Sequence, residues 1–200
     1  MSKLPGSFYQ RDDVLLIAKE LMGKILATKW DGVLTSGRIV ECEAYAGPAD
    51  RASHAVGGRR TNRNEIMYAP GGLAYVYLCY GIHHMFNVVT HGKGVPHAIL
   101  IRALEPLKGI AEMERRRKTN ELHHLCRGPG NLAMALGIRT NHNGTSLRSK
   151  ELFIEDDGFS YTATQIKKSP RIGVDYAGEH AAWPYRFYVK GNPNVSGKVK

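Results

Sequence analysis

The chain has 200 residues, 42% of them hydrophobic, and its 28 Lys and Arg against 18 Asp and Glu give a formal net charge of +10 at pH 7. It has no run of about 18 apolar residues, no apolar signal-peptide core and no internal repeat. These features exclude a membrane-spanning or repeat protein and predict one cytoplasmic globular domain over residues 1–200. The charge is typical of a protein that binds polyanions, although a solvated basic face would also produce it.

Hydrophobic periodicity and turn residues predict the secondary structure in chain order. The first half predicts a helix over Asp12–Met22, a hairpin of Lys24–Trp30 with a strand from Val33, an alternating strand over Arg38–Tyr45, and a second hairpin of Leu73–Tyr80 with Met85–Thr90 around a turn at Gly81–His84. The second half predicts a strand over Ala98–Leu104, helices over Pro106–Lys118 and Asn131–Leu136, and a strand over Arg186–Lys190.

These elements indicate an α+β fold, because hairpins outnumber helices and no strand–helix–strand alternation appears. We expect a mixed, mostly antiparallel curved β-sheet with a protruding β-hairpin and surrounding helices. The first residues, 1–7, and the Lys-, Gly- and Asn-rich tail, 191–200, are expected to be loosely ordered. No heptad pattern is present, so we expect a monomer.

Arg102 is a charged residue inside an otherwise apolar predicted strand. Arginine stays ionised, so burial of its guanidinium requires a nearby anion. Glu41 and Glu43, which share the polar face of their strand with Tyr45, are candidates, as is a substrate phosphate. An ordinary salt bridge would explain Arg102 as well, and an ordinary solvent-facing strand would explain the two glutamates.

Tyr80 is the last residue before the predicted turn glycine and has the opposite parity to Tyr75 and Tyr77. A large ring at a hairpin tip, next to Ile82, suits insertion between base pairs, where apolar side chains unstack a step. Tyrosine also favours strands in general, and that simpler explanation fits Tyr75 better than Tyr80.

His54 precedes a segment rich in glycine and arginine, residues 57–61, whose flexible backbone and positive charge suit contact with a phosphate. The other histidines offer less. His83-His84 and His123-His124 are adjacent pairs, and neighbours on a strand point to opposite faces. No H-x-x-x-H or C-x-x-C framework is present, so we expect no metal and no cofactor.

Several ordered blocks together resemble one known family. They are R-I-V-E-C-E-A-Y-A-G-P-A-D (38–50), His54 with G-G-R-R-T-N-R-N (57–64), Y-V-Y-L-C-Y-G (75–81), Asn87, L-I-R-A-L-E-P-L (100–107), G-P-G-N-L (128–132), R-I-G-V-D-Y-A-G-E (171–179) and R-F-Y-V-K-G-N-P (186–193). From about Phe8 onward the chain resembles a bacterial member of the alkyladenine DNA glycosylase (3-methyladenine DNA glycosylase) family, whose fold is typified by the mammalian enzyme. The stretch between Arg139 and Lys168 carries no motif of that family.

The resemblance implies a monofunctional glycosylase of base excision repair. Such an enzyme binds duplex DNA in the minor groove, flips out 3-methyladenine, hypoxanthine or ethenoadenine, and hydrolyses the N-glycosidic bond. The implied catalytic residues are Glu43, as the base that activates a water, and Arg102 and the carbonyl of Ile172, which hold that water. The implied base-pocket residues are Tyr45, His54, Tyr77 and Asn87, of which Asn87 clashes with the guanine 2-amino group. The implied DNA contacts are the wedge Tyr80 with Ile82, Arg59, Thr61 and Arg63.

Two other classes remain open at this point. A helix-hairpin-helix glycosylase would use Leu125–Leu136 as its phosphate-binding hairpin and an aspartate shortly downstream. Asp156 and Asp157 lie in an acidic loop that does not resemble that setting, and such enzymes are largely helical, whereas this chain is rich in hairpins. A non-enzymatic minor-groove or RNA-binding module would explain the basic charge and the tyrosines. It would not explain Arg102 in an apolar strand.

Overall fold

The structure, a computed structural model, describes residues 1–197. The α-helices are α1 (Gly6–Tyr9), α2 (Val14–Leu21), α3 (Ile110–Arg117) and α4 (Pro129–Ala135). The strands are β1 (Ser2–Lys3), β2 (Ile25–Trp30), β3 (Val33–Tyr45), β4 (Ala74–Cys79), β5 (His83–Thr90), β6 (His97–Lys108), β7 (Leu152–Asp156), β8 (Ile166–Ser169) and β9 (Arg186–Val189). Short 3-10 helices lie in the loops: η1 (Gly47–Ala49), η2 (Val56–Gly58), η3 (Glu65–Tyr68), η4 (Leu122–His124), η5 (Thr140–His142) and η6 (Asp175–Ala182).

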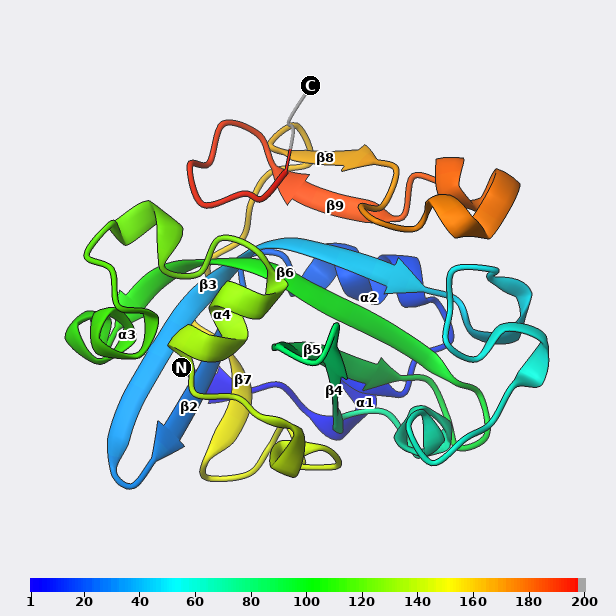
Figure 1. Cartoon of the computed structure of the whole chain (residues 1–200), viewed down its shortest axis with the longest axis horizontal. Coiled ribbons are helices and arrows are strands. Elements are labelled where there is room, and N and C mark those ends of the chain that lie inside the picture. Colours follow the sequence, from blue (N-terminus) through cyan, green and yellow to red (C-terminus); the bar gives the residue numbers. More distant parts are fainter. Residues whose placement is uncertain (198–200) are drawn as a thin grey trace.

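The strands form one sheet in which β3 has three partners. The main path runs β1-β7-β2-β3-β6-β5-β4, and β9 pairs with both β3 and β8. One edge of β3 is shared, because β2 pairs with its first half and β9 with residues 41–43, while β6 pairs along the other edge. Register shifts at Gly37 and Glu41 mark β-bulges, which bend a strand. Figure 1 shows the resulting curvature of the long strands β3 and β6.

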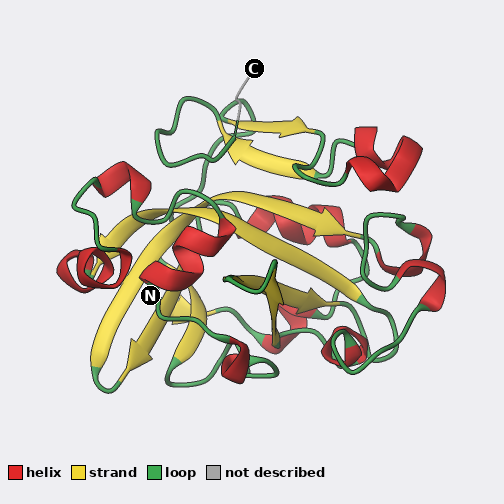
Figure 2. Ribbon diagram, in the orientation of Figure 1, coloured by secondary structure: helices red, strands yellow, loops and turns green. Residues whose placement is uncertain are grey.

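The predicted α+β fold is confirmed, with a curled antiparallel sheet and a few helices packed on it. Every pairing between named strands in residues 1–197 is antiparallel, so the parallel component that we expected of a mixed sheet is not found there. In Figure 2, α4 lies in front of the sheet and α2 behind it. The alternation of β3 fits this arrangement, since the buried Cys42 thiol contacts Ala18 and Met22 on the α2 side.

The predicted helix before the first hairpin and the two hairpins are confirmed, with differences at two ends. We expected the second hairpin to turn at Gly81–His84, but β5 already begins at His83, which leaves a tighter turn. We expected a helix from Pro106, but β6 continues to Lys108 and α3 starts at Ile110. Pro106 lies opposite Gly37 at a β-bulge, one of the few places in a sheet that tolerate a residue without an N–H.

The structure also places both ends of the described chain against the domain. Ser2 pairs with Asp156 of β7, and Leu4 is buried. In the tail, Asn194, Val195 and Ser196 are buried. The remainder of the tail, residues 198–200, lies outside the described residues. Within residues 1–197, no helix has the length and apolar character that crossing a membrane requires.

Candidate active site

One face of the sheet collects the predicted catalytic and pocket residues. The register pairs Glu43 of β3 with Leu100 of β6, and it pairs Asn87 of β5 with both Leu100 and Tyr75 of β4. Residues paired directly across neighbouring strands point to the same face. The Glu43 carboxylate and the Asn87 carboxamide therefore belong to one row, and Tyr45, two residues after Glu43, extends the same face.

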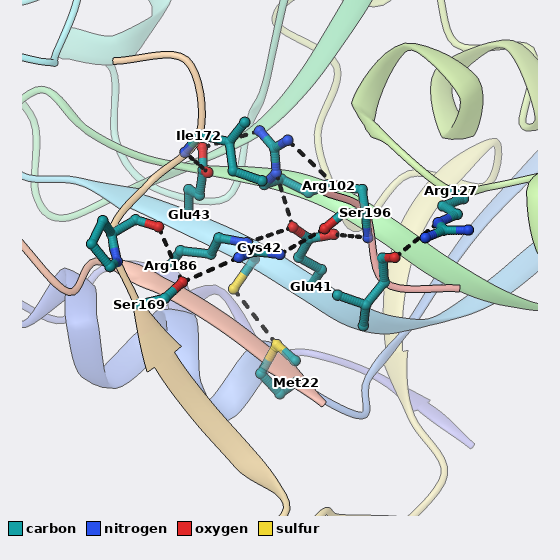
Figure 3. A network of polar contacts seen from close by, with 12 residues as sticks. Met22, Glu41, Cys42, Glu43, Arg102, Arg127, Ser169, Ile172, Arg186 and Ser196 are labelled. Atoms are coloured by element: carbon teal, nitrogen blue, oxygen red, sulfur yellow. Dashed lines mark hydrogen bonds and ion pairs between the residues drawn. The ribbon is translucent and has the colours of Figure 1, made fainter. Parts of the chain in front are cut away.

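Three protein groups donate hydrogen bonds to the fully buried Glu43 carboxylate. Figure 3 shows two of these donors, Arg102 and Ile172. Tyr45 Oη donates to Oε2 over 2.9 Å, the Ile172 backbone N–H donates to Oε1 over 2.8 Å, and Arg102 Nη1 donates to Oε2 over 3.3 Å. Burial and then the nearby Glu43 raise the pKa of Tyr45 well above its ordinary value, so the phenol keeps its proton and donates. The carboxylate is thus held in one orientation.

Arg102 bridges the two glutamates, as its position in an apolar strand required. Its Nε donates to Glu41 Oε1 over 3.1 Å, in addition to the contact of Nη1 with Glu43. Burial lowers the pKa of Arg102, but Glu43 and Glu41 outweigh burial and raise it above its ordinary value. The salt bridge that we considered as the alternative explanation is present, and it involves the carboxylate predicted to be the general base.

A pocket beside Glu43 brings together all four predicted base-pocket residues. Its walls are mostly aromatic or small, as a site for a flat ring requires. The lining residues are Tyr45, Ala52, His54, Met67, Tyr75, Tyr77, Asn87, Ala98 and Tyr176. We had assigned Tyr75 to ordinary packing, and the sequence drew no attention to Tyr176. It lies in η6, is 71% exposed, and its hydroxyl donates to the Ala52 carbonyl over 3.2 Å.

His54 is an uncharged wall of this pocket. Its Nδ1 lies 2.8 Å from Tyr75 Oη, and its ring meets that of Tyr77 edge-on at a centroid distance of 4.7 Å. Burial, then Arg63 and Arg59, lower the pKa of His54 to about 4, so the imidazole is neutral at pH 7. A neutral ring can pack against a flat ligand without the cost of burying a charge.

A buried hydrogen bond holds the side chain of Asn87. Its side chain is buried, and Nδ2 donates to the backbone carbonyl of Tyr75 over 3.1 Å. Pinned in this way on a central strand, the carboxamide cannot swing aside without losing a buried hydrogen bond. It therefore presents a rigid polar group to anything in the pocket.

Tyr80 protrudes from the tip of the β4–β5 hairpin, as the sequence predicted. The ring is 91% exposed, and Ile82 beside it is 68% exposed. Tyr80 has φ 50° and Gly81 φ 72°, and the Ile82 N–H bonds to the Cys79 carbonyl, which is a type I′ turn. A bulky residue with positive φ is strained, and such strain clusters at functional positions.

The basic loop beside the pocket is held from within by Asn64. This buried side chain accepts from the backbone and hydroxyl of Thr61 and donates to the carbonyls of His54 and Arg59. The predicted DNA contacts Arg59, Thr61 and Arg63 are exposed on this loop. Arg63 also lies over the Tyr77 ring, 4.7 Å from its centroid. The loop therefore joins the pocket wall to an outward-facing positive surface.

The three arginines in the last turn of α3, Arg115–Arg117, differ in role from the exposed arginines of the basic loop. Arg116 pairs with Glu112 and donates to the Ala135 carbonyl, and Arg117 donates to the Leu125 carbonyl. These contacts fasten α3 to the segment that carries α4. In contrast, Arg115 is mostly exposed, although it also pairs with Glu112.

A buried ion pair that the sequence did not predict lies next to Tyr45 and Ile172, the two uncharged donors to Glu43. Asp50 and Arg171 are bound through both carboxylate oxygens and both terminal guanidinium nitrogens, with side chains that are 0% exposed. Arg171 also lies over the Tyr45 ring, 4.8 Å from its centroid, and precedes Ile172. The only sequence signal was the presence of the two residues in recognisable blocks, because a pair 121 residues apart has no local pattern.

Comparison with known proteins gives a consistent result over nearly the whole chain. Residues 7–193 match the family model described as Methylpurine-DNA glycosylase (MPG). A protein of Chlamydia felis that carries the provisional name 3-methyladenine DNA glycosylase is 49% identical over 93% of this chain and 95% of its own length. A Bacillus cereus protein with the same provisional name is 48% identical over 97% of this chain and 98% of its own length.

Proposed function

The chain belongs to the methylpurine-DNA glycosylase family, and we propose that it removes 3-methyladenine, hypoxanthine and ethenoadenine from duplex DNA with a water activated by Glu43. Members of this family are DNA repair enzymes that hydrolyse N-glycosyl bonds, and its substrate is DNA. The observation that carries the proposal is the buried Glu43 carboxylate, which accepts a hydrogen bond from Tyr45, a residue that lines an aromatic pocket.

The proposed reaction begins with extrusion of the base from the minor-groove side, because a base inside a duplex is out of reach. Tyr80 fills the gap, and Tyr45, His54 and Tyr77 stack on the flipped purine. Stacking on aromatic side chains is worth about 1–3 kcal/mol per base, which offsets part of the cost of unstacking. The exposed arginines of the basic loop hold the flanking phosphates.

In the chemical step, water attacks C1′ of the sugar and Glu43 accepts its proton. The N-glycosidic bond breaks, and its electron pair leaves with the base. A cationic alkylated purine becomes neutral on leaving, whereas hypoxanthine needs protonation. Arg102 and the carbonyl of Ile172 would orient the water, while the Ile172 N–H keeps Glu43 in place.

The proposal is tested with a duplex oligonucleotide that contains one hypoxanthine, incubated with the enzyme and then cleaved by alkali at abasic sites. We expect a product strand with this duplex and with the ethenoadenine and 3-methyladenine counterparts, and none with undamaged DNA. Binding without any product would favour a non-enzymatic module. The two aspartates considered for a helix-hairpin-helix glycosylase lie at the end of β7 and pair with basic residues, Asp156 with Lys24 and Asp157 with Arg38.

Tyr80→Ala should impair flipping while leaving the fold and the binding of undamaged duplex intact. The ring contributes little to the core at 91% exposure, and loss of its stacking should lower single-turnover excision of hypoxanthine about 10- to 100-fold. Stopped-flow fluorescence of ethenoadenine reports flipping directly. Phe159→Ala, another exposed aromatic, is the matched control. A Tyr80→Ala protein that melts far below wild type would identify the ring as ordinary packing.

Asn87→Ser should weaken discrimination against guanine. The shorter side chain removes the carboxamide that we propose to clash with the guanine 2-amino group, and a steric difference of about one methylene in a pocket typically changes selectivity about 10- to 200-fold. The measurement is the ratio of excision rates for hypoxanthine and for guanine in the same sequence. A ratio equal to that of wild type would remove Asn87 from this role.

A further inference from the structure

The C-terminal segment Asn192–Ser196 folds back onto β3 and reaches the charged network of the site (Figure 3). The Ser196 backbone N–H donates to Glu41 Oε2 over 2.7 Å, and its carbonyl accepts from Arg186 Nη2 over 2.7 Å. The Ser196 hydroxyl accepts from Arg102 Nη2 over 3.4 Å. The tail thus touches the same guanidinium that contacts Glu43.

Further contacts fasten the same segment. The Val195 side chain is buried in the main core, and its carbonyl accepts from Arg127 Nε over 3.0 Å. Asn192 Nδ2 donates to Glu105 Oε2 over 3.1 Å. Just beyond, a Cβ placed on Gly197 would lie 2.6 Å from Ile172 Cδ1, closer than real atoms approach. The tail therefore packs against Ile172 as well, the residue whose N–H donates to Glu43.

Glu41 is occupied entirely by this assembly. Its Oε1 accepts from Arg102 Nε over 3.1 Å and from Arg186 Nε over 2.7 Å, while Oε2 accepts from Ser196. Glu41 is 0% exposed, and its carboxylate joins two arginines to the tail. Glu41 therefore does not face solvent, which was the alternative that the sequence left open for this residue.

The geometry of a guanidinium turns these contacts into an orienting device. The group is planar, and its nitrogens lie in a fixed fork. In Arg102, Nε donates to Glu41 and Nη2 donates to the Ser196 hydroxyl, so two of the three nitrogens have partners other than Glu43. The position of the third, Nη1, follows from the plane, and it lies 3.3 Å from Glu43 Oε2.

We propose that Glu41 and the segment Asn192–Ser196 are positioning parts of the active site, which hold the Arg102 guanidinium against Glu43. This inference rests on the proposed function of Glu43. Arg186 belongs to the same device, because it links Glu41 to the Ser196 carbonyl. In this proposal these groups act through Arg102 and not directly on the reacting atoms.

Ser196→Pro is the direct test, because proline has no N–H to donate to Glu41. Undocking should make the exposed Lys190–Gly191 bond a faster site of trypsin cleavage. Single-turnover excision of hypoxanthine should slow about 10- to 100-fold, the typical cost of a misplaced catalytic group. Affinity for the lesion duplex should change far less than the excision rate. A general loss of folding would instead reduce binding and excision together.

Two further variants complete the experiment. Ser160→Ala alters an exposed serine outside the segment and should excise at the wild-type rate. Glu41→Gln keeps the shape but removes the charge that holds both arginines, so its rate should also fall while binding persists. Because Glu41 is buried among charges, the rate of Glu41→Gln is normalised to the folded fraction of the protein. If Glu41→Gln fails to fold, Ser196→Pro alone tests the proposal.

Excision by Ser196→Pro at the wild-type rate overturns the proposal, whatever the result of trypsin cleavage. If trypsin cleaves the variant faster, the segment has undocked and is dispensable for excision. If trypsin cleaves it no faster, the Ser196 N–H is not the group that docks the segment. A rate loss matched by an equal loss of affinity would assign the segment to DNA binding instead. Failure of the wild-type protein to excise any lesion would overturn the proposed function and leave the contacts of the segment unaffected.

Discussion

Glu43→Gln should abolish most excision while leaving the fold and the binding of lesion DNA in place. The amide keeps the shape of the side chain, and its oxygen can still accept from the Ile172 N–H while its NH2 group donates to the Tyr45 hydroxyl. It loses the contact with Arg102 Nη1, and it cannot accept a proton from water. Removal of a general base typically costs about 10²–10⁴-fold in rate. Arg102 retains Glu41 as a charged partner, so no guanidinium is left buried without an anion.

The measurement is single-turnover excision of hypoxanthine, with affinity for the lesion duplex and the melting temperature recorded for the same preparations. Glu155→Gln, the same substitution on β7 of the same sheet, is the matched control. Glu41→Gln is not a silent control, because its carboxylate holds Arg102. If Glu43→Gln excised at the wild-type rate while Glu41→Gln was inactive, the water would have to lie on the Glu41 side.

The parts of the site that the sequence predicted are those with a local pattern. Strand alternation identified Glu43 and Tyr45 as neighbours on one face, and a single charge in an apolar run marked Arg102 as needing an anion. Turn chemistry placed Tyr80 at an exposed tip. Each of these inferences uses residues within one element, where periodicity fixes direction.

The parts that it missed depend on contacts between distant segments. Ser196 meets Glu41 across 155 positions, and no periodicity encodes such a contact. Glu41 could not be distinguished from a solvent-facing residue, because a second partner strand, β9, and the tail cover it only after folding. The elements β1, β7 and β8 were missed because their short runs, SK, LFIED and IKKS, mix apolar with charged or polar residues, whereas RFYV of the equally short β9 consists mostly of strand-favouring residues.

The end of β6 shows why one helix was predicted too early. Pro106 is typical of a helix start, and the apolar and charged residues after it have helical spacing. In the structure, pairing with β3 extends the strand to Lys108, and the helix begins only after Gly109, which has φ 73°. A Cβ on Gly109 would lie 2.3 Å from the Leu34 carbonyl, so only glycine fits where β6 gives way to α3.

Asp50→Asn should destabilise the protein more than any exposed substitution, because it leaves the Arg171 guanidinium buried without its anion. Both side chains are 0% exposed, and Asp50 also accepts from the backbone N–H groups of Ala46 and Ala52. Breaking a buried pair by removing one partner costs about 3–5 kcal/mol. For a chain of this length that corresponds to a fall of about 6–20 °C in melting temperature.

Excision should fall as well, because Arg171 lies over the Tyr45 ring and its backbone leads directly into Ile172, so both uncharged donors to Glu43 depend on it. Glu65→Gln breaks an exposed pair with Arg60 and serves as the control, because solvent screens such a pair and its loss should change the melting temperature little. The double variant Asp50→Asn with Arg171→Met removes the unpaired charge and should melt higher than Asp50→Asn alone. If Asp50→Asn and Glu65→Gln had the same melting temperature, the Asp50–Arg171 pair would not be what supports the Glu43 side of the site.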